Sequence, residues 1–217
     1  MTFEGPAPFD YRNVRVLNRA YLTLLQADRH ARQSLLKLSP PLIRRITSLT
    51  RHQVERLSAT PFLLLSFRER DDKLWDRIIS DDACADLFTR PVADDLDRLR
   101  SAGLGFVWQL ARQNPYTLRL ICGASLHWCE QIAERTFFDL LAAVAPHADL
   151  LELRRGNDAE LWWKLLDNGI CREADIRTAA HVSALQTMLT RPVDHAPRSW
   201  AVAACRSKTG GLRVAEE

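Results

Sequence analysis

Residues 49–72 read LTRHQVERLSATPFLLLSFRERDD, and this stretch decides the fold that we expect for the rest of the chain. It opens with a capping box, in which the Thr50 hydroxyl accepts from the backbone N–H of Gln53 and the Gln53 side chain reaches back to the N–H of Thr50. This pattern predicts a short helix, which a Thr-Pro pair closes because proline disfavours helical geometry in the residue before it. A very apolar run, residues 62–65, follows and stops abruptly at the charged cluster of residues 68–72. Such a boundary indicates a buried element that emerges at a surface.

Length and composition narrow the class of protein. The chain has 217 residues, 47% of them hydrophobic, and a net charge of +3. That is enough for one large domain or two small ones with a core. No apolar run approaches the ~20 residues that a membrane-spanning helix needs, and the N-terminus lacks the basic and then apolar pattern of a signal peptide. Five scattered cysteines do not resemble a disulfide framework, so we expect a cytoplasmic protein with no membrane partner.

The positive charge is concentrated near the N-terminus. Residues 1–72 hold 12 lysines and arginines against 7 acidic residues, whereas residues 73–100 hold 5 against 7. Nearly all of these cations are arginine, which can bind a phosphate group through two parallel hydrogen bonds. The bias indicates either a nucleic-acid surface or a genome with biased codons.

Residues 11–38 have the pattern of a long helix with a heptad-like seam. Residues on this seam recur at steps of three and four, namely Val14, Leu17, Tyr21, Leu24, Asp28, Ala31, Leu35 and Leu38. A stripe of this kind packs either inside its own domain or against a second chain. Asp28 is either retained for register or partner choice, or it points outward and pairs with Arg32. The candidate dimer or partner contacts on this helix are Leu17, Tyr21, Leu24 and Asp28.

Two short helices are expected next, with almost no loop between them. The sequence Ser39-Pro40-Pro41 predicts the start of a new helix, with a serine cap and proline in the first turn. The capping-box helix follows it closely. Such a pair is either a helix-turn-helix or an ordinary helical hairpin. In the DNA-reading version, the phosphate contacts would be Arg44, Arg45, Arg51 and Arg56.

The apolar run of residues 62–67 is compatible with a buried strand or with one more core helix. We predict a helix, because no other convincing strand lies nearby to pair with it. Further helices are expected in residues 71–79, 92–113, 115–122, 125–144, 157–168 and 173–190.

These elements predict an all-α protein with two helical domains. The expected divisions are a loose arm at residues 1–10, a first domain at 11–90, a second domain of unknown role at 91–190 and a mostly disordered tail at 191–217. The boundary follows from the breaker Thr89-Arg90-Pro91.

Candidate chemistry is sparse. Cys122, His127 and Cys129 are close enough in sequence to suggest a metal site, but their spacing matches no zinc pattern, and small buried thiols are the simpler interpretation. The chain has no nucleophile elbow and no glycine-rich phosphate loop. We therefore predict no catalytic residue, metal or cofactor, and no enzyme. Adjacent Trp162 and Trp163 lie ~100° apart on a helix, so either one of them meets a partner or the surface, or the helix has a wide buried face.

The opening stretch also carries a resemblance. The order L-T-x-x-Q-x-x-x-L-A/S-x-T, then an apolar run, then F-R-x-x-D, is similar to FlhD, the bacterial flagellar master-regulator subunit. The residues that match are Leu49, Thr50, Gln53, Leu57, Ser58, Thr60, Phe67, Arg68 and Asp71. The similarity covers the N-terminal part only, about residues 14–80.

The resemblance implies a helical dimerisation domain that acts in the cytoplasm as a transcriptional activator, bound to promoter DNA beside an FlhC-like subunit. It makes Phe67 and Arg68 candidate contacts for a dimer or another partner. Leu65 stands where the family has a cysteine, so a dimer-linking disulfide is not available there. The second half has no counterpart in the family; it would supply DNA contacts, replace the partner subunit or serve an unrelated regulatory purpose. The leading hypothesis is a DNA-binding regulator that acts as a homodimer or with an FlhC-like partner, and the alternative is a protein–protein adaptor that uses the module only for assembly.

Overall fold

Helices make up most of the protein. The computed structural model describes residues 5–27, 38–80 and 94–190. Within these residues lie ten α-helices, a 3-10 turn and two short strands. In chain order they are α1 (Pro8–Ala27), α2 (Pro40–Thr47), α3 (Arg51–Leu57), β1 (Leu65–Ser66), α4 (Asp72–Ser80), α5 (Asp95–Gln113), α6 (Pro115–Cys122), α7 (Leu126–Glu134), α8 (Phe137–Val144), η2 (Ala148–Leu150), β2 (Glu152–Leu153), α9 (Ala159–Asp167) and α10 (Ala174–Thr190). The prediction of an all-α protein is confirmed.

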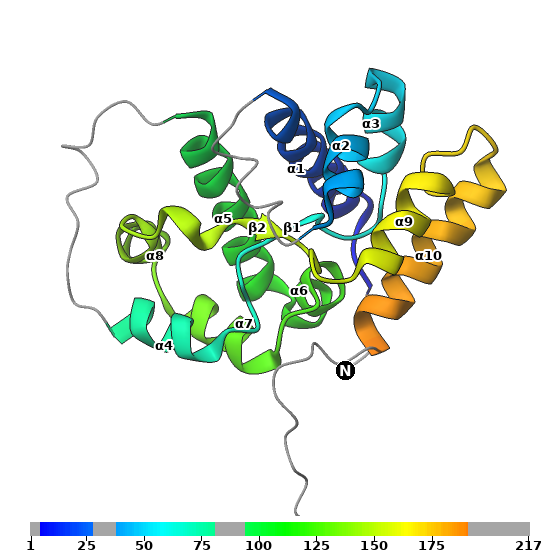
Figure 1. Cartoon of the computed structure of the whole chain (residues 1–217). Coiled ribbons are helices and arrows are strands. Elements are labelled where there is room, and N and C mark those ends of the chain that lie inside the picture. Colours follow the sequence, from blue (N-terminus) through cyan, green and yellow to red (C-terminus); the bar gives the residue numbers. More distant parts are fainter. Residues whose placement is uncertain (1–4, 28–37, 81–93, 191–217) are drawn as a thin grey trace, which may run out of the picture.

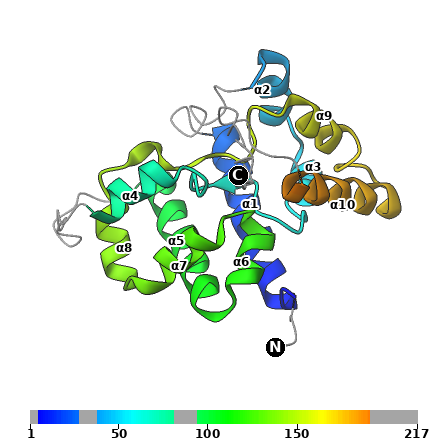
Figure 2. The ribbon, with the colours of Figure 1, turned by 90° about the horizontal axis from the view of Figure 1, so that it is seen from below.

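The two strands lie in the middle of the molecule, with helices on either side (Figure 1). Helices α4, α7 and α8 lie on one side and the α9–α10 hairpin on the other, while α1 runs between the two groups (Figure 2). Helix α1 packs against α2, α3 and α5, and α2 packs against α9. Helix α5 is the centre of the remaining helices, since it contacts α6, α7 and α8.

The first helix follows its predicted stripe. Its buried side chains include Val14, Leu17, Tyr21 and Leu25, at steps of three and four residues. It begins at Pro8, so it takes in part of the segment that was expected to be a loose arm. It is described as far as Ala27; the later part of the predicted seam, with Asp28, lies outside the described residues.

The capping box that opens α3 is confirmed. The Thr50 hydroxyl accepts from the Gln53 N–H at 3.4 Å, and the Thr50 N–H donates to Gln53 Oε1 at 2.9 Å. Ser39 does occupy the cap position of α2, but its side chain makes no capping hydrogen bond. There, the prolines in the first turn define the start of the helix instead.

The prediction of a helix for residues 62–67 is wrong. This run is extended, and its strand β1 pairs with β2 in antiparallel register, with Leu65 opposite Leu153 and Ser66 opposite Glu152. On either side of the strand, the Leu63 N–H donates to the Ile121 carbonyl at 3.1 Å, and the Arg154 N–H donates to the Leu64 carbonyl at 2.8 Å. The hydrogen bonds that a helix would form within itself are therefore made with distant parts of the chain.

A buried asparagine of α1 binds the beginning of this run. The Asn18 side-chain amide donates to the Phe62 carbonyl at 2.8 Å and to Thr60 Oγ1 at 3.0 Å. Its oxygen accepts from the Leu64 N–H at 2.7 Å. Because Asn18 is fully buried, this single side chain replaces a neighbouring strand for the backbone groups that it meets.

The C-terminal helices follow the predicted order, with two corrections. The single helix expected over 125–144 is two, because Arg135 is extended and the Thr136 side chain caps α8 by accepting from the Asp139 N–H. The helix expected from residue 157 begins at Ala159, and the Asp158 side chain caps it. Helix α6 ends at residue 122 as predicted, and Gly123 follows it in the left-handed conformation, at φ 66°.

The described halves of the chain share one hydrophobic core. Buried side chains from α1–α3, from the extended run and from α5–α10 form a single cluster. The predicted domain boundary near residue 90 and the predicted tail lie outside the described residues, so the division into domains stays a prediction. Within the described part of the chain, none of the helices combines the length and apolar character that crossing a bilayer requires.

Candidate functional site

Three arginines of the α2–α3 pair are exposed to solvent. Arg44 and Arg45 lie on α2, and Arg51 is the first residue of α3. Their guanidinium groups form no hydrogen bond or ion pair with any residue that the structure describes. Groups of this kind are open to phosphate oxygens, which arginine binds in a bidentate manner.

The fourth predicted phosphate contact is used inside the molecule. Arg56 is half-buried, and its Nη1 donates to the Ile170 carbonyl at 3.1 Å. This bond fastens α3 to the connection between α9 and α10. The guanidinium of Arg56 therefore has a hydrogen-bond acceptor within the chain, unlike those of Arg44, Arg45 and Arg51 among the described residues.

Ion pairs connect α1 to the exposed side of α3. Glu55 lies 3.3 Å from Arg15 Nη2 and 2.7 Å from Arg19 Nη1. The two arginine side chains are 55% and 50% exposed. Asp10 is buried, so Glu55 is the only carboxylate that α1 and α3 present at the surface. We call this region the α1–α3 surface; its charged residues are Arg12, Arg15, Arg19, Arg51 and Glu55.

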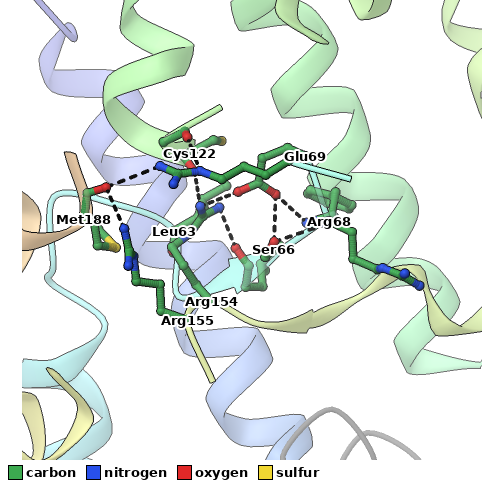
Figure 3. Close-up of polar contacts among 12 residues, drawn as sticks. Leu63, Ser66, Arg68, Glu69, Cys122, Arg154, Arg155 and Met188 are labelled. Carbon is green, nitrogen blue, oxygen red and sulfur yellow. Dashed lines mark hydrogen bonds and ion pairs between the residues drawn. The ribbon is translucent and has the colours of Figure 1, made fainter. Parts of the chain in front are cut away.

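The charged cluster after the apolar run is joined to the C-terminal half of the chain (Figure 3). Glu69 and Arg154 form a buried ion pair, with side-chain exposures of 3% and 7%. Arg154 also donates to the carbonyls of Leu63, Leu65 and Cys122. A buried charge is tolerated when it is paired and its remaining donors are satisfied, and Arg154 meets both conditions.

The second oxygen of Glu69 orders the turn that follows β1. It accepts from Ser66 Oγ at 2.7 Å and from the Phe67 N–H at 3.0 Å. Arg68 has the left-handed φ of 53°, and its side chain pairs with Asp71 at 2.7 Å and with Asp149 at 3.2 Å. Hydrogen bonds and an ion pair within the turn therefore stabilise it, and the Arg68–Asp149 ion pair joins it to η2.

Arg70 and Arg155 meet at the end of α10. Arg70 donates to the Gly123 carbonyl at 2.8 Å and to the Met188 carbonyl at 3.3 Å. Arg155 donates to the same Met188 carbonyl at 3.2 Å. Cations at the last turn of a helix satisfy carbonyls that lack a partner in the helix and oppose its negative end. The segment of residues 67–71 thus binds the chain's own C-terminal half.

Two cysteines of the described residues are enclosed in the core. Cys122 and Cys129 are both buried, and desolvation raises the pKa of the Cys122 thiol far above its usual range and the pKa of Cys129 to about 12. Thiols in this state are poor nucleophiles at neutral pH. In the part of the chain that the structure describes, no three His, Cys, Asp or Glu side chains come together so that they could hold a metal ion.

Comparison with known proteins assigns the N-terminal part. Residues 10–93 match the family model of the flagellar transcriptional activator FlhD. The N-terminal part of the chain is FlhD-like. The match covers less than half of the 217 residues, and the family is one of transcriptional activators rather than enzymes. No curated protein and no solved structure matches the chain.

The FlhD-like part contains the six candidate partner contacts, and three of them are buried within the chain itself. Leu17, Tyr21 and Phe67 belong to the core, at exposures of 7%, 0% and 0%. Leu24 and Arg68 are half-buried and reach the surface. Asp28 lies outside the described residues.

Close packing explains why Phe67 is unavailable to another chain. Its ring lies against Gly103 of α5, where an added Cβ would come within 2.7 Å of the ring. Its carbonyl accepts from the Trp75 indole N–H at 3.0 Å. The aromatic side chain of the FlhD-like motif is thus anchored in the C-terminal half.

Sequence reasoning missed the polar residues that join the FlhD-like part to the rest. Asn18, Glu69 and Arg154 are all buried and hydrogen-bonded. One signal was present for Asn18, since it lies beside the apolar seam of α1. For Arg154 no local pattern exists, because its partner Glu69 is 85 positions away.

Proposed function

We propose that the chain regulates transcription by binding promoter DNA through the α2–α3 pair, in the cytoplasm, as a homodimer or together with an FlhC-like subunit. The family match supports the regulatory role, because residues 10–93 include both helices. In this proposal Arg44, Arg45 and Arg51 contact phosphates, which position a protein on DNA without reading its sequence.

The observation that carries the proposal is the contrast among arginines of the FlhD-like part. Arg56 and Arg70 donate to carbonyls of the chain itself, whereas Arg44, Arg45 and Arg51 are exposed with no partner among the described residues. Exposed cations on two closely connected short helices make a compact positive surface. That arrangement suits the phosphate backbone of DNA.

In this proposal a partner chain contacts those candidate residues that are not buried in the core. Leu24 and Arg68 remain accessible, while Leu17, Tyr21 and Phe67 are occupied. A homodimer or an FlhC-like subunit would therefore approach α1 beside Leu24, or the turn at Arg68.

Charge reversal on α2 tests the DNA contact. In a gel-shift titration with the region upstream of the chain's own gene, Arg44→Glu with Arg45→Glu should weaken binding about tenfold or more, and should flatten the dependence of log Kd on log salt by about 2 units. The loss should be the same on a random duplex, because phosphate contacts are sequence-independent.

A matched control is Arg77→Glu with Arg98→Glu, which makes the same change in net charge at exposed positions of α4 and α5. Equal loss in both double variants would contradict a specific role for α2. Repeating the titration with an FlhC-like protein separates the two modes of binding. Binding only in its presence identifies an accessory subunit.

A second candidate function is a protein–protein adaptor. Several apolar side chains of the α9–α10 hairpin are exposed, namely Trp163, Ile176, Val182 and Leu189. A groove of about 410 Å³ lies between the two helices. Ile176 lines this groove, and apolar surface of this kind is typical of protein contacts. Absence of DNA binding, with and without the FlhC-like protein, would favour this function.

A further inference from the structure

The α1–α3 surface adjoins the proposed DNA contact. Helix α3 follows α2 almost directly and packs on α1. Arg51 opens α3 as one of the proposed phosphate contacts, and Glu55 lies one turn further along the same helix. Beyond Glu55 are Arg15 and Arg19 of α1. DNA bound at Arg51 would therefore bring phosphates close to a carboxylate that is paired with two arginines.

The charge of this surface is strongly unequal. Four arginines are exposed on it, at positions 12, 15, 19 and 51, against the single carboxylate of Glu55. Arg12, Arg15 and Arg19 recur at steps of three and four, so they form one row along α1. A row of exposed cations attracts the negatively charged phosphate backbone of a nucleic acid.

The ion pairs at Glu55 are of the kind that phosphate can displace. Arg15 and Arg19 are about half exposed, and exposed pairs are weak because water and salt screen them. A DNA phosphate brings a higher density of negative charge and gains from counterion release. Glu55 and a phosphate would compete for the same guanidinium groups.

We propose that Arg15 and Arg19 form a second phosphate-contact site for double-stranded DNA, and that Glu55 limits the affinity of that site by holding both arginines. This inference rests on the proposed function. It adds to that function a specific element of control, in which one carboxylate sets how tightly the protein holds DNA of any sequence.

Glu55→Gln tests the inference directly. Fluorescence anisotropy with a labelled duplex of the chain's own upstream region, in a salt titration, should show binding about three- to tenfold tighter than for the unchanged protein, with a salt slope steeper by about 1 to 2 units. A random duplex of equal length should show the same gain. Arg15→Gln with Arg19→Gln, added to Glu55→Gln, should abolish it.

The matched control is Glu160→Gln on α9. It removes the same charge and releases a comparable exposed ion pair, Glu160 with Lys164 at 2.7 Å, on a different helix. An equal gain from Glu160→Gln would overturn the inference, because net charge alone would then explain it. So would unchanged affinity of Glu55→Gln with a lowered melting temperature, which would make the pair merely structural.

The outcomes keep the two proposals apart. If the unchanged protein binds DNA and Arg44→Glu with Arg45→Glu weakens it, while Glu55→Gln has no effect, only the inference fails. If neither the unchanged protein nor Glu55→Gln binds DNA at any salt concentration, with or without the FlhC-like protein, the proposed function fails and the inference with it.

Discussion

Arg154 is a buried arginine whose side chain binds three backbone carbonyls in the centre of the protein. It donates to the carbonyls of Leu63, Leu65 and Cys122 and pairs with the carboxylate of Glu69. The planar guanidinium has five donors in a fixed fork, so one side chain can meet several acceptors at once. Its importance follows from being buried and from making four hydrogen bonds, not from its charge alone.

Removing this side chain should strongly destabilise the protein. Arg154→Leu leaves Glu69 as an unpaired buried charge, and we expect the free energy of unfolding to fall by about 3 to 5 kcal/mol. Urea denaturation followed by circular dichroism measures it. Arg98→Leu, which breaks the exposed pair with Asp95, should cost less than about 1 kcal/mol. Similar losses in the two variants would contradict this account.

At the scale of elements, the sequence predicted those features whose interactions are local. The capping box at Thr50 and the end of α6 before Gly123 depend on partners within four residues, and both were predicted correctly. The extended run of residues 62–67 was predicted wrongly because its partners, Asn18, Ile121 and β2, are far away in the chain. Tertiary hydrogen bonds here override a local apolar pattern.

The same distinction applies to the candidate site. The exposure of Arg44, Arg45 and Arg51 follows from helical periodicity around the buried positions of α2 and α3. The burial of Phe67 and the hydrogen bond from Arg56 to the Ile170 carbonyl do not follow from this periodicity. Both depend on contacts with the C-terminal half of the chain. Exposure on one helix face can be predicted from the sequence, and a contact between distant elements cannot.

Two glycines of α5 give a test of the close approach between elements. A Cβ at Gly103 would lie 2.7 Å from the Phe67 ring, which is fully buried, whereas a Cβ at Gly105 would lie 3.2 Å from the edge of the half-buried Phe137. Alanine in a helix gains about 1 kcal/mol over glycine, and overpacking costs about 1 to 3 kcal/mol. We therefore expect Gly103→Ala to lower the thermal midpoint and Gly105→Ala to leave it unchanged or raise it.

Differential scanning calorimetry of the two variants decides this prediction. Both substitutions are on one helix and have the same intrinsic propensity, so each serves as the control for the other. A rise of the midpoint in Gly103→Ala would show that Phe67 can move away, and would contradict the tight packing described.

At the scale of the whole molecule, the FlhD-like part and the C-terminal half complete a common core. Helix α1 packs on α5, α2 packs on α9, and β1 pairs with β2. The turn after β1 reaches α6 and α10 through Arg70. The part that matches the family therefore packs against residues that the family match does not cover.

Residues 1–93 made alone should not fold cooperatively. Without α5, β2 and Arg154, the core side chains of residues 62–67 lose their cover and several backbone groups lose their partners. Thermal melts by circular dichroism, together with proton NMR dispersion, should show no sharp transition for this fragment and a sharp one for the full chain. A cooperative transition in the fragment would show that the FlhD-like part is an independent domain.

The extended run also has a consequence during synthesis. The ribosome completes Leu63 some 91 positions before Arg154, the residue that binds its carbonyl, and at ~5–20 residues per second that interval lasts ~5–18 s. Until then a segment of four consecutive large apolar residues, with no charge and no proline among them, has unpaired backbone groups and is prone to aggregate. The growing chain therefore passes through a period in which it is a natural client for chaperones, and chains that terminate early would stay in that state.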